Sequence, residues 1–125
     1  VYIAMLNEDA RSVIGVPHPT GRAAMRMLED EGFRADGYVD IFDGGPTMVA
    51  WTDNVTSVKN ACERPVTGLD ASEGERAILA TGRLGTFRAC FGARVLGADG
   101  TIAIDSASAD LLDVCDGDTV WSVAR

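Results

Sequence analysis

The sequence contains few histidines and cysteines, the residues from which metal sites and disulfide frameworks are built. It contains one histidine and three cysteines, and no two cysteines stand at a C-x-x-C spacing. Structural zinc sites are built from about four clustered nitrogen or sulfur ligands, so we expect no bound metal. An odd number of cysteines without paired spacing is typical of a reducing compartment. We therefore predict a cytoplasmic protein in which Cys90 and Cys115 are buried as free thiols.

Basic residues and long apolar runs are also scarce. Eleven lysines and arginines stand against 19 aspartates and glutamates, which gives a formal net charge of −8. Nucleic-acid binding depends on clustered basic residues that neutralise phosphates, so we expect no nucleic-acid partner. An acidic surface favours a cationic substrate instead. No apolar run reaches the roughly 20 residues of a membrane span, so we expect no membrane partner either.

The beginning of the chain shows no basic segment followed by an apolar one, so no signal peptide is visible. Because the first residue is Val1 and not methionine, we expect a fragment or a processed piece of a longer protein. With 46% hydrophobic and 24% charged residues, the composition is that of a folded globular protein. A chain of 125 residues suffices for one domain or two very small ones.

The first half of the chain mixes helix and strand signals. Thr20 is placed to begin a helix whose apolar residues recur at helical spacing, and Gly32 is placed to end it. Asn7 is placed to cap an earlier helix. The predicted elements are a strand over residues 1–6, helices over 8–14, 20–31 and 53–59, and strands over 38–42 and 47–52 joined by a glycine turn at 43–46.

The second half is rich in strand-forming residues. Residues 61–75 are polar and contain Pro65, Gly68 and Gly74, which predicts a linker. Several short strands around one helix then predict a small β-barrel. The predicted elements are strands over residues 76–81, 87–96, 100–104 and 119–123, and a helix over 106–114 capped by Ser106 or Ser108. This divides the chain into 1–60, a linker at 61–75, and 76–125.

Four stretches of the sequence resemble one enzyme family. VIGVPHPTGRAAMRMLEDEGF, GYVDIFDGGPT, ATGRLGTFRACF and VCDGDTVW are similar to the C-terminal part of arginine N-succinyltransferase. The string GYVDIFDGGPT is unusual, and the match covers nearly the whole chain. The resemblance implies an α+β fold, in which residues 1–60 are the C-terminal segment of an acyl-CoA N-acyltransferase (GNAT-like) mixed sheet and residues 76–125 form the small barrel.

The resemblance also implies a reaction, the transfer of succinyl from succinyl-CoA to the α-amine of L-arginine in arginine catabolism. In this family a histidine in an HP motif is taken as the proton donor, and it corresponds to His18 in Val16-Pro17-His18-Pro19. Imidazole suits that role because its unperturbed pKa of about 6.5 lies near neutral pH. The alternative is that His18 only makes hydrogen bonds within its loop.

Three further residues are candidates for binding the substrate. Asp40 and Asp43 could hold the guanidinium or ammonium groups of arginine by charge-assisted hydrogen bonds, and Tyr38 could supply a hydroxyl. Each also has a structural alternative. Asp43 would cap a turn, Asp40 would be a solvent-facing strand residue, and Tyr38 would pack on its strand.

The chain departs from the broader acyl-CoA N-acyltransferase pattern in two places. Many of these enzymes carry a tyrosine acid five residues before the phenylalanine of a Gly-Phe pair, and that position is Leu28 here. The superfamily also holds the CoA pyrophosphate with a glycine-rich loop opening a helix, and this sequence contains no such loop. We therefore expect no cofactor bound by this segment alone, with succinyl-CoA entering as co-substrate.

The missing CoA loop leads to an expected partner. We expect an N-terminal acyltransferase segment or a second polypeptide to complete the enzyme, and exposed sheet edges to favour an oligomer. The competing hypothesis is a non-catalytic binding or scaffold module derived from the same fold.

Overall fold

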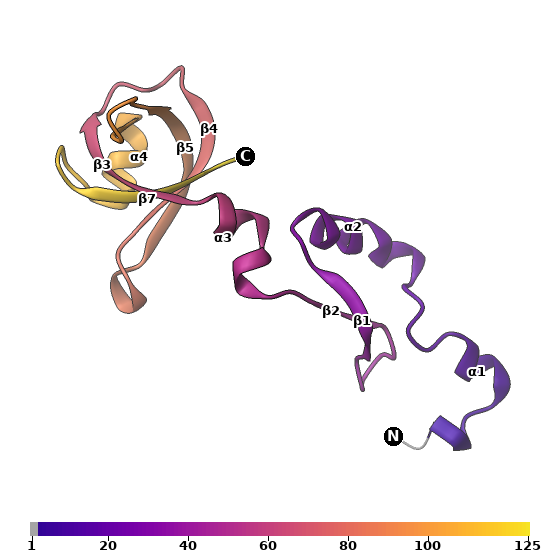
Figure 1. Ribbon diagram of the computed structural model, residues 1–125. Coiled ribbons are helices and arrows are strands. Elements are labelled where there is room, and N and C mark those ends of the chain that lie inside the picture. The colour runs from indigo at the N-terminus through magenta and orange to yellow at the C-terminus, as the bar shows by residue number, and fades with distance from the viewer. Residues whose placement is uncertain (1–2) are drawn as a thin grey trace. The chain divides into compact units, whose positions relative to one another are not determined.

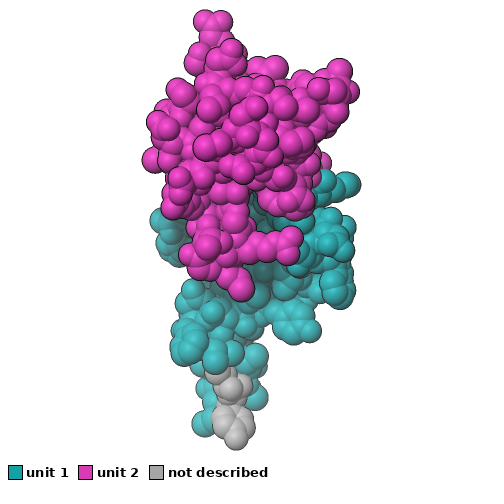
Figure 2. Space-filling view, turned by 90° about the vertical axis from the view of Figure 1, so that its left-hand side faces the viewer, with its two compact units in different colours: residues 1–59 teal, residues 60–125 magenta. Residues whose placement is uncertain are grey.

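The structure is a computed structural model that describes residues 3–125. The chain divides into two compact units, one up to Lys59 and one from Asn60 onward (Figures 1 and 2). No helix within residues 3–125 is long and apolar enough to cross a membrane.

The first unit consists of short helices and a two-stranded sheet. The strand predicted over residues 1–6 is wrong where it is described, because Ile3–Met5 is a 3-10 turn; residues 1 and 2 lie outside the described residues. No described strand pairs with this segment, so its backbone closes a local turn instead. The further elements are α1 Glu8–Ser12, η2 Pro19–Gly21, α2 Arg22–Asp30, β1 Arg34–Val39, β2 Pro46–Val49, η3 Thr52–Asn54 and α3 Thr56–Asn60.

Two helix ends in this unit follow the sequence signals. Asn7 caps α1, because its Oδ1 accepts a hydrogen bond from the backbone N–H of Ala10 at 2.8 Å. Gly32 follows α2 with φ +97°, and Phe33 N–H donates back to the carbonyl of Leu28 at 2.9 Å. A positive φ with this return bond is a Schellman-type helix end, for which glycine is preferred.

The start of α2 differs from the prediction. Thr20 does not cap the helix, since it lies inside the 3-10 turn η2, and Gly21 occupies the N-cap position without a side-chain hydrogen bond. His18 caps η2 instead.

The predicted hairpin is confirmed, but its first strand is displaced and its second is shorter: β1 covers residues 34–39 where 38–42 was predicted, and β2 covers 46–49 where 47–52 was predicted. β1 and β2 pair antiparallel, from Arg34 opposite Val49 to Val39 opposite Pro46. The first strand ends at Val39 because Asp40 already belongs to the turn, where Asp40 N–H donates to the Gly45 carbonyl at 2.9 Å and the Asp40 carbonyl accepts from Gly44 N–H at 3.0 Å.

The second unit is a closed five-stranded barrel, which confirms the predicted small barrel and the α+β class (Figure 1). The strand order is β3-β6-β5-β4-β7, and only the β3–β6 pair is parallel. Closing a sheet in this way leaves no unpaired edge strand. The elements are β3 Cys62–Gly68, β4 Glu75–Thr81, η4 Leu84–Thr86, β5 Arg88–Leu96, β6 Ile102–Ile104, α4 Ser106–Leu112 and β7 Thr119–Ala124.

The linker predicted over residues 61–75 is wrong in its first half. Residues 62–68 form β3, which pairs with both β6 and β7. The strand was hidden because its outward positions, such as Glu63 and Pro65, are polar or are proline, while the inward-facing Val66 is fully buried. Only the following residues, up to Gly74, form the turn that leads into β4.

The barrel core is closed at one side by α4. Gly92 in β5 allows the helix to lie close, because a Cβ at this position would collide with the Ser108 hydroxyl. Neither predicted cap, Ser106 or Ser108, caps the helix; Asp105 does, since its Oδ1 accepts from Ser108 N–H at 2.9 Å. The fully buried large apolar side chains are those of Val66, Leu79, Ile102, Ile104, Leu112 and Val120.

Cys90 and Cys115 were predicted to be buried, and this prediction is wrong for both. Cys90 is half-buried against the barrel core. Cys115 is exposed, because it lies in the turn after α4, where its N–H donates to Asp118 Oδ2 at 2.8 Å. All three cysteines are free.

Candidate functional site

A groove in the first unit brings together three of the four predicted site residues. His18, Asp40 and Asp43 line an open cavity of about 700 Å³. Its walls come from the loop before η2, one face of α2, the β1–β2 turn and the start of β2. The other lining residues are Val16, Pro17, Gly21, Ala24, Met25, Leu28, Gly45, Pro46, Thr47 and Met48.

His18 is held by its own loop. The chain approaches through Pro17 and leaves through Pro19, and both prolines restrict the backbone around the histidine. The imidazole Nδ1 lies 2.7 Å from Thr20 Oγ1, and the backbone N–H of Thr20 lies 3.4 Å from the same nitrogen. Nδ1 is therefore engaged, and Nε2 is the ring nitrogen without a hydrogen bond among the described residues.

Asp40 and Asp43 are oriented by the turn that connects β1 and β2. Asp40 Oδ1 accepts from the N–H of Phe42 at 2.7 Å, and Asp43 Oδ1 accepts from the N–H of Gly45 at 2.7 Å. The turn-capping alternative for Asp43 is thus present in the structure, and Asp40 makes the same kind of contact. In each case one carboxylate oxygen is used, and the second oxygen remains available to a ligand.

The charge of this groove is negative. Its lining residues include two carboxylates and no lysine or arginine. None of the ion pairs within residues 3–125 involves Asp40 or Asp43. Two carboxylates without a basic partner favour a cationic ligand, because an incoming ammonium or guanidinium would supply the missing opposite charge.

Tyr38 is placed differently from the other candidates. It lies on β1 and is 67% exposed, and it does not line the groove. Leu28 does line it. The described residues include no group of three or more His, Cys, Asp or Glu side chains that would hold a metal ion.

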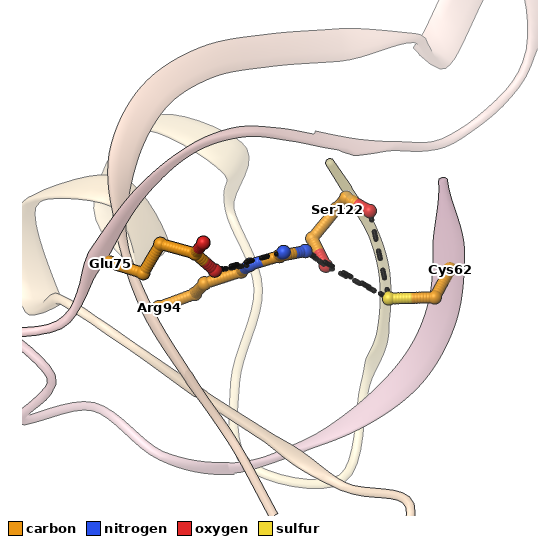
Figure 3. Close-up of polar contacts among 4 residues, drawn as sticks. All are labelled: Cys62, Glu75, Arg94 and Ser122. Carbon is orange, nitrogen blue, oxygen red and sulfur yellow. Dashed lines mark hydrogen bonds and ion pairs between the residues drawn. The ribbon is translucent and has the colours of Figure 1, made fainter. Parts of the chain in front are cut away.

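A second polar cluster is centred on the buried Arg94 of the barrel and reaches the surface at Glu75 (Figure 3). The buried guanidinium of Arg94 donates to Ser122 Oγ at 2.8 Å and to Glu75 Oε2 at 3.0 and 3.1 Å, while Cys62 Sγ lies 3.3 Å from Ser122 Oγ. Burial raises the pKa of the Cys62 thiol, but hydrogen bonds from Ser122 and Arg64 and the charge of Arg94 outweigh it, so that the pKa lies below its usual range. These contacts tie strands β3, β4, β5 and β7 together.

The sequence did not reveal two of these arrangements. The Thr20–His18 contact was hidden because Thr20 also fits a helix cap, although a hydroxyl two residues after a histidine is a visible signal. The Arg94 cluster joins residues up to 60 positions apart, so no local pattern indicates it.

Comparison with known proteins defines the class of the chain. A family model described as "Arginine N-succinyltransferase beta subunit" matches residues 1–57. A second model, described as the C-terminal domain of the same arginine N-succinyltransferase beta subunit, matches residues 63–124. The chain belongs to the arginine N-succinyltransferase family.

Individual relatives agree with the family models. An arginine N-succinyltransferase of Yersinia pseudotuberculosis serotype O:3 (strain YPIII) is 39% identical over 132 residues, covering 99% of this chain and 37% of the relative. The subunit named alpha of the Pseudomonas aeruginosa enzyme is 35% identical, with the same coverage. The subunit named beta is 48% identical over 58 residues, covering 46% of this chain and 17% of the relative.

A solved structure shares the fold. The arginine/ornithine succinyltransferase subunit AI from Pseudomonas aeruginosa superposes with a TM-score of 0.79 at 32% identity. The match covers 99% of this chain and 37% of the solved chain. The chain therefore spans somewhat over a third of the length of these curated and solved relatives.

Proposed function

We propose that this chain is the acceptor-side portion of an arginine N-succinyltransferase, which transfers succinyl from succinyl-CoA to the α-amine of L-arginine. The observation that carries the proposal is the groove in which His18 lies with two carboxylates that form no ion pair with any described residue. The names of the relatives support the same reaction. In this proposal the β1–β2 hairpin is the last part of a GNAT-like acyltransferase sheet, and α2 is a helix of the same domain. The enzyme is proposed to be cytoplasmic.

The reaction requires a group that moves one proton. The α-amine nitrogen attacks the thioester carbonyl carbon, the carbon–sulfur bond breaks, and CoA leaves as a thiolate. The nitrogen loses one proton and the sulfur gains one. In the proposal, Nε2 of His18 accepts the proton from the amine and delivers it to the departing thiolate. Leu28 leaves no tyrosine to act as the acid at its position.

The carboxylates are proposed to hold the cationic side chain of the acceptor. Asp40 and Asp43 each keep one oxygen on a backbone N–H, so the turn fixes their direction while the other oxygen receives the guanidinium. Tyr38 stays a proposed hydroxyl contact, and its position outside the groove predicts a small contribution.

Replacing Asp43 with asparagine tests this assignment. Asparagine can still accept from Gly45 N–H, so the turn is kept while the charge is lost. We expect KM for arginine to rise by roughly tenfold or more, since a hydrogen bond to a charged group contributes about 1.5–3 kcal/mol. The measurement is steady-state kinetics of succinylarginine formation by the whole enzyme.

Two matched variants serve as controls for Asp43→Asn. Asp36→Asn removes a carboxylate of β1 that lies outside the groove, and Tyr38→Phe removes only a hydroxyl. Asp36→Asn should leave KM for arginine unchanged, and Tyr38→Phe should raise it only slightly, as expected for a small contribution of the hydroxyl. A similar rise in KM for Asp36→Asn would show that arginine binding depends only on the net charge of the chain. The proposal that Asp43 holds the guanidinium group would then be wrong.

The proposal includes a partner for the first unit. None of residues 3–59 is buried, and large apolar side chains are exposed, with Phe42 at 92%, Met5 at 83% and Trp51 at 75%. Exposed apolar surface of this extent is typical of an interface. We propose that this unit is covered by an N-terminal acyltransferase segment or by a second polypeptide that supplies the CoA site, forming an oligomer in the second case.

Hydrogen exchange tests this assembly. Mixing the chain with the remaining portion of the enzyme should slow amide exchange in β1 and β2. The barrel strand β4, which already pairs with β5 and with β7, serves as the internal control. The same mixture should release free CoA thiol in the presence of arginine and succinyl-CoA, with ornithine as the comparison acceptor. Protection without any acyl transfer or arginine binding would favour the scaffold hypothesis instead.

A further inference from the structure

We propose that Thr20 is a positioning residue that holds the imidazole ring of His18 in place through its side-chain hydroxyl. The inference rests on the proposed function only for its effect on the reaction rate. The contact itself is a feature of this chain and is measurable without any activity.

The inference is carried by the geometry of two contacts to one ring nitrogen. Thr20 Oγ1 lies 2.7 Å from Nδ1 of His18, a normal length for a hydrogen bond that involves a hydroxyl. The backbone N–H of Thr20 lies 3.4 Å from the same atom, beyond the usual range for N–H donors. The short hydroxyl contact therefore dominates, and the backbone contact adds little.

A hydroxyl is suited to this position because it can donate or accept. A bare Nδ1 accepts the hydroxyl proton of Thr20, whereas a protonated Nδ1 donates to the oxygen lone pairs. The ring is thus held in every protonation state that a proton carrier passes through. When Nδ1–H donates to Oγ1, Nε2 is free to take a proton from the amine and release it to the thiolate.

The loop around His18 restricts its backbone, but among the described residues only Thr20 restricts the orientation of its imidazole ring. Pro17 and Pro19 restrict the backbone, but the side-chain torsions of an exposed histidine stay free without a partner. Within residues 3–125, the only other hydrogen bond to the His18 side chain is the long one from the Thr20 N–H. Removing the hydroxyl alone should therefore loosen the ring and leave the fold intact.

Nuclear magnetic resonance measures the ring directly. The chain has a single histidine, so its Cε1–H signal needs no assignment by mutagenesis. In Thr20→Val, which keeps the shape and removes the hydroxyl, we expect the order parameter of the ring to fall toward the flexible range, below roughly 0.6. Thr20→Ser keeps a hydroxyl at the same position and should retain the order of the unmodified protein.

Kinetics of the whole enzyme measure the consequence. Thr20→Val should lower kcat by about 10- to 100-fold, because a small misplacement of a reacting group costs up to about 10²-fold. KM for arginine should stay unchanged, since the carboxylates are not altered. Thr20→Ser should restore kcat.

The outcomes separate this inference from the proposed function. A ring as ordered in Thr20→Val as in the unmodified protein overturns the inference, and so does a loosened ring with unchanged kcat. Absence of succinyl transfer in the unmodified enzyme contradicts the proposed function, while the order parameters still decide whether Thr20 holds the ring. Loosening in Thr20→Val with rescue by Thr20→Ser supports the inference, provided that kcat falls with it wherever the unmodified enzyme transfers succinyl.

Discussion

Replacing His18 with glutamine is expected to lower kcat for succinyl transfer by roughly 10²- to 10⁴-fold, the usual contribution of a positioned acid–base group. Glutamine keeps a polar side chain of similar reach, but its amide cannot exchange a proton near neutral pH. In transition-state terms the loss is about 3–5 kcal/mol. The measurement is release of CoA thiol by the whole enzyme at saturating arginine and succinyl-CoA.

The design of this test depends on the exposed position of His18. The side chain lies outside any core, so the variant should keep the melting temperature and the far-ultraviolet spectrum of the unmodified protein. KM for arginine should change little, because Asp40 and Asp43 remain in the groove. A folded variant with full kcat would remove His18 from the mechanism and leave its loop hydrogen bond as its whole role.

Residues that act locally were predictable from the sequence. Asn7 and Gly32 begin and end their helices as expected, because capping depends only on neighbouring backbone groups. The barrel strands after residue 75 were predicted because their inward residues are apolar. The role of His18 was predicted from the family resemblance, and those of Asp40 and Asp43 from the affinity of carboxylates for a guanidinium group. That the three residues line one groove was not predicted, since nothing local to His18 indicates the turn between β1 and β2.

Residues that depend on distant partners were not predictable. Strand β3 was interpreted as a linker because its polar outward face resembles a loop, and only pairing with β7, more than 50 positions away, identifies it as a strand. The segment at Ile3–Met5 has strand-forming residues but no described strand beside it, so propensity alone gave the wrong element. Serine and aspartate cap helices about equally well, which explains why Ser106 or Ser108 was predicted where Asp105 is the cap.

Asp105 is expected to be the most sensitive carboxylate for barrel stability. One oxygen accepts from Ser108 N–H at 2.9 Å, and the other accepts from the Ser108 hydroxyl and from Ala93 N–H, both at 2.7 Å. Asp105→Ala removes the cap of α4, which costs about 1 kcal/mol, and leaves the buried Ser108 hydroxyl and the Ala93 N–H without their partner. We expect the free energy of unfolding to fall by about 2–4 kcal/mol.

Thermal or urea unfolding of the chain measures this loss. A change of this size should lower the melting temperature of so small a domain by roughly 10–25 °C. Asp110→Ala is the matched control, because Asp110 is an exposed carboxylate of the same helix whose side chain has no hydrogen bond among the described residues. Equal destabilisation by both variants would show that the charge near α4 matters and the three hydrogen bonds do not.

The pH dependence of the unfolding free energy gives a second measure of the hydrogen bonds of Asp105. Burial raises the pKa of Asp105, but hydrogen bonds from Ala93 and Ser108 outweigh it, so the pKa in the folded chain lies below its ordinary value of about 3.9. A carboxyl with a lowered folded pKa stabilises the fold above its unfolded pKa, and this stability is lost as pH falls through the folded pKa. The difference in unfolding free energy between the unmodified chain and Asp105→Asn should therefore be constant near neutral pH and shrink below about pH 4. A difference that stays constant down to pH 2 would mean that the ionised carboxylate of Asp105 stabilises the fold no more than its protonated form.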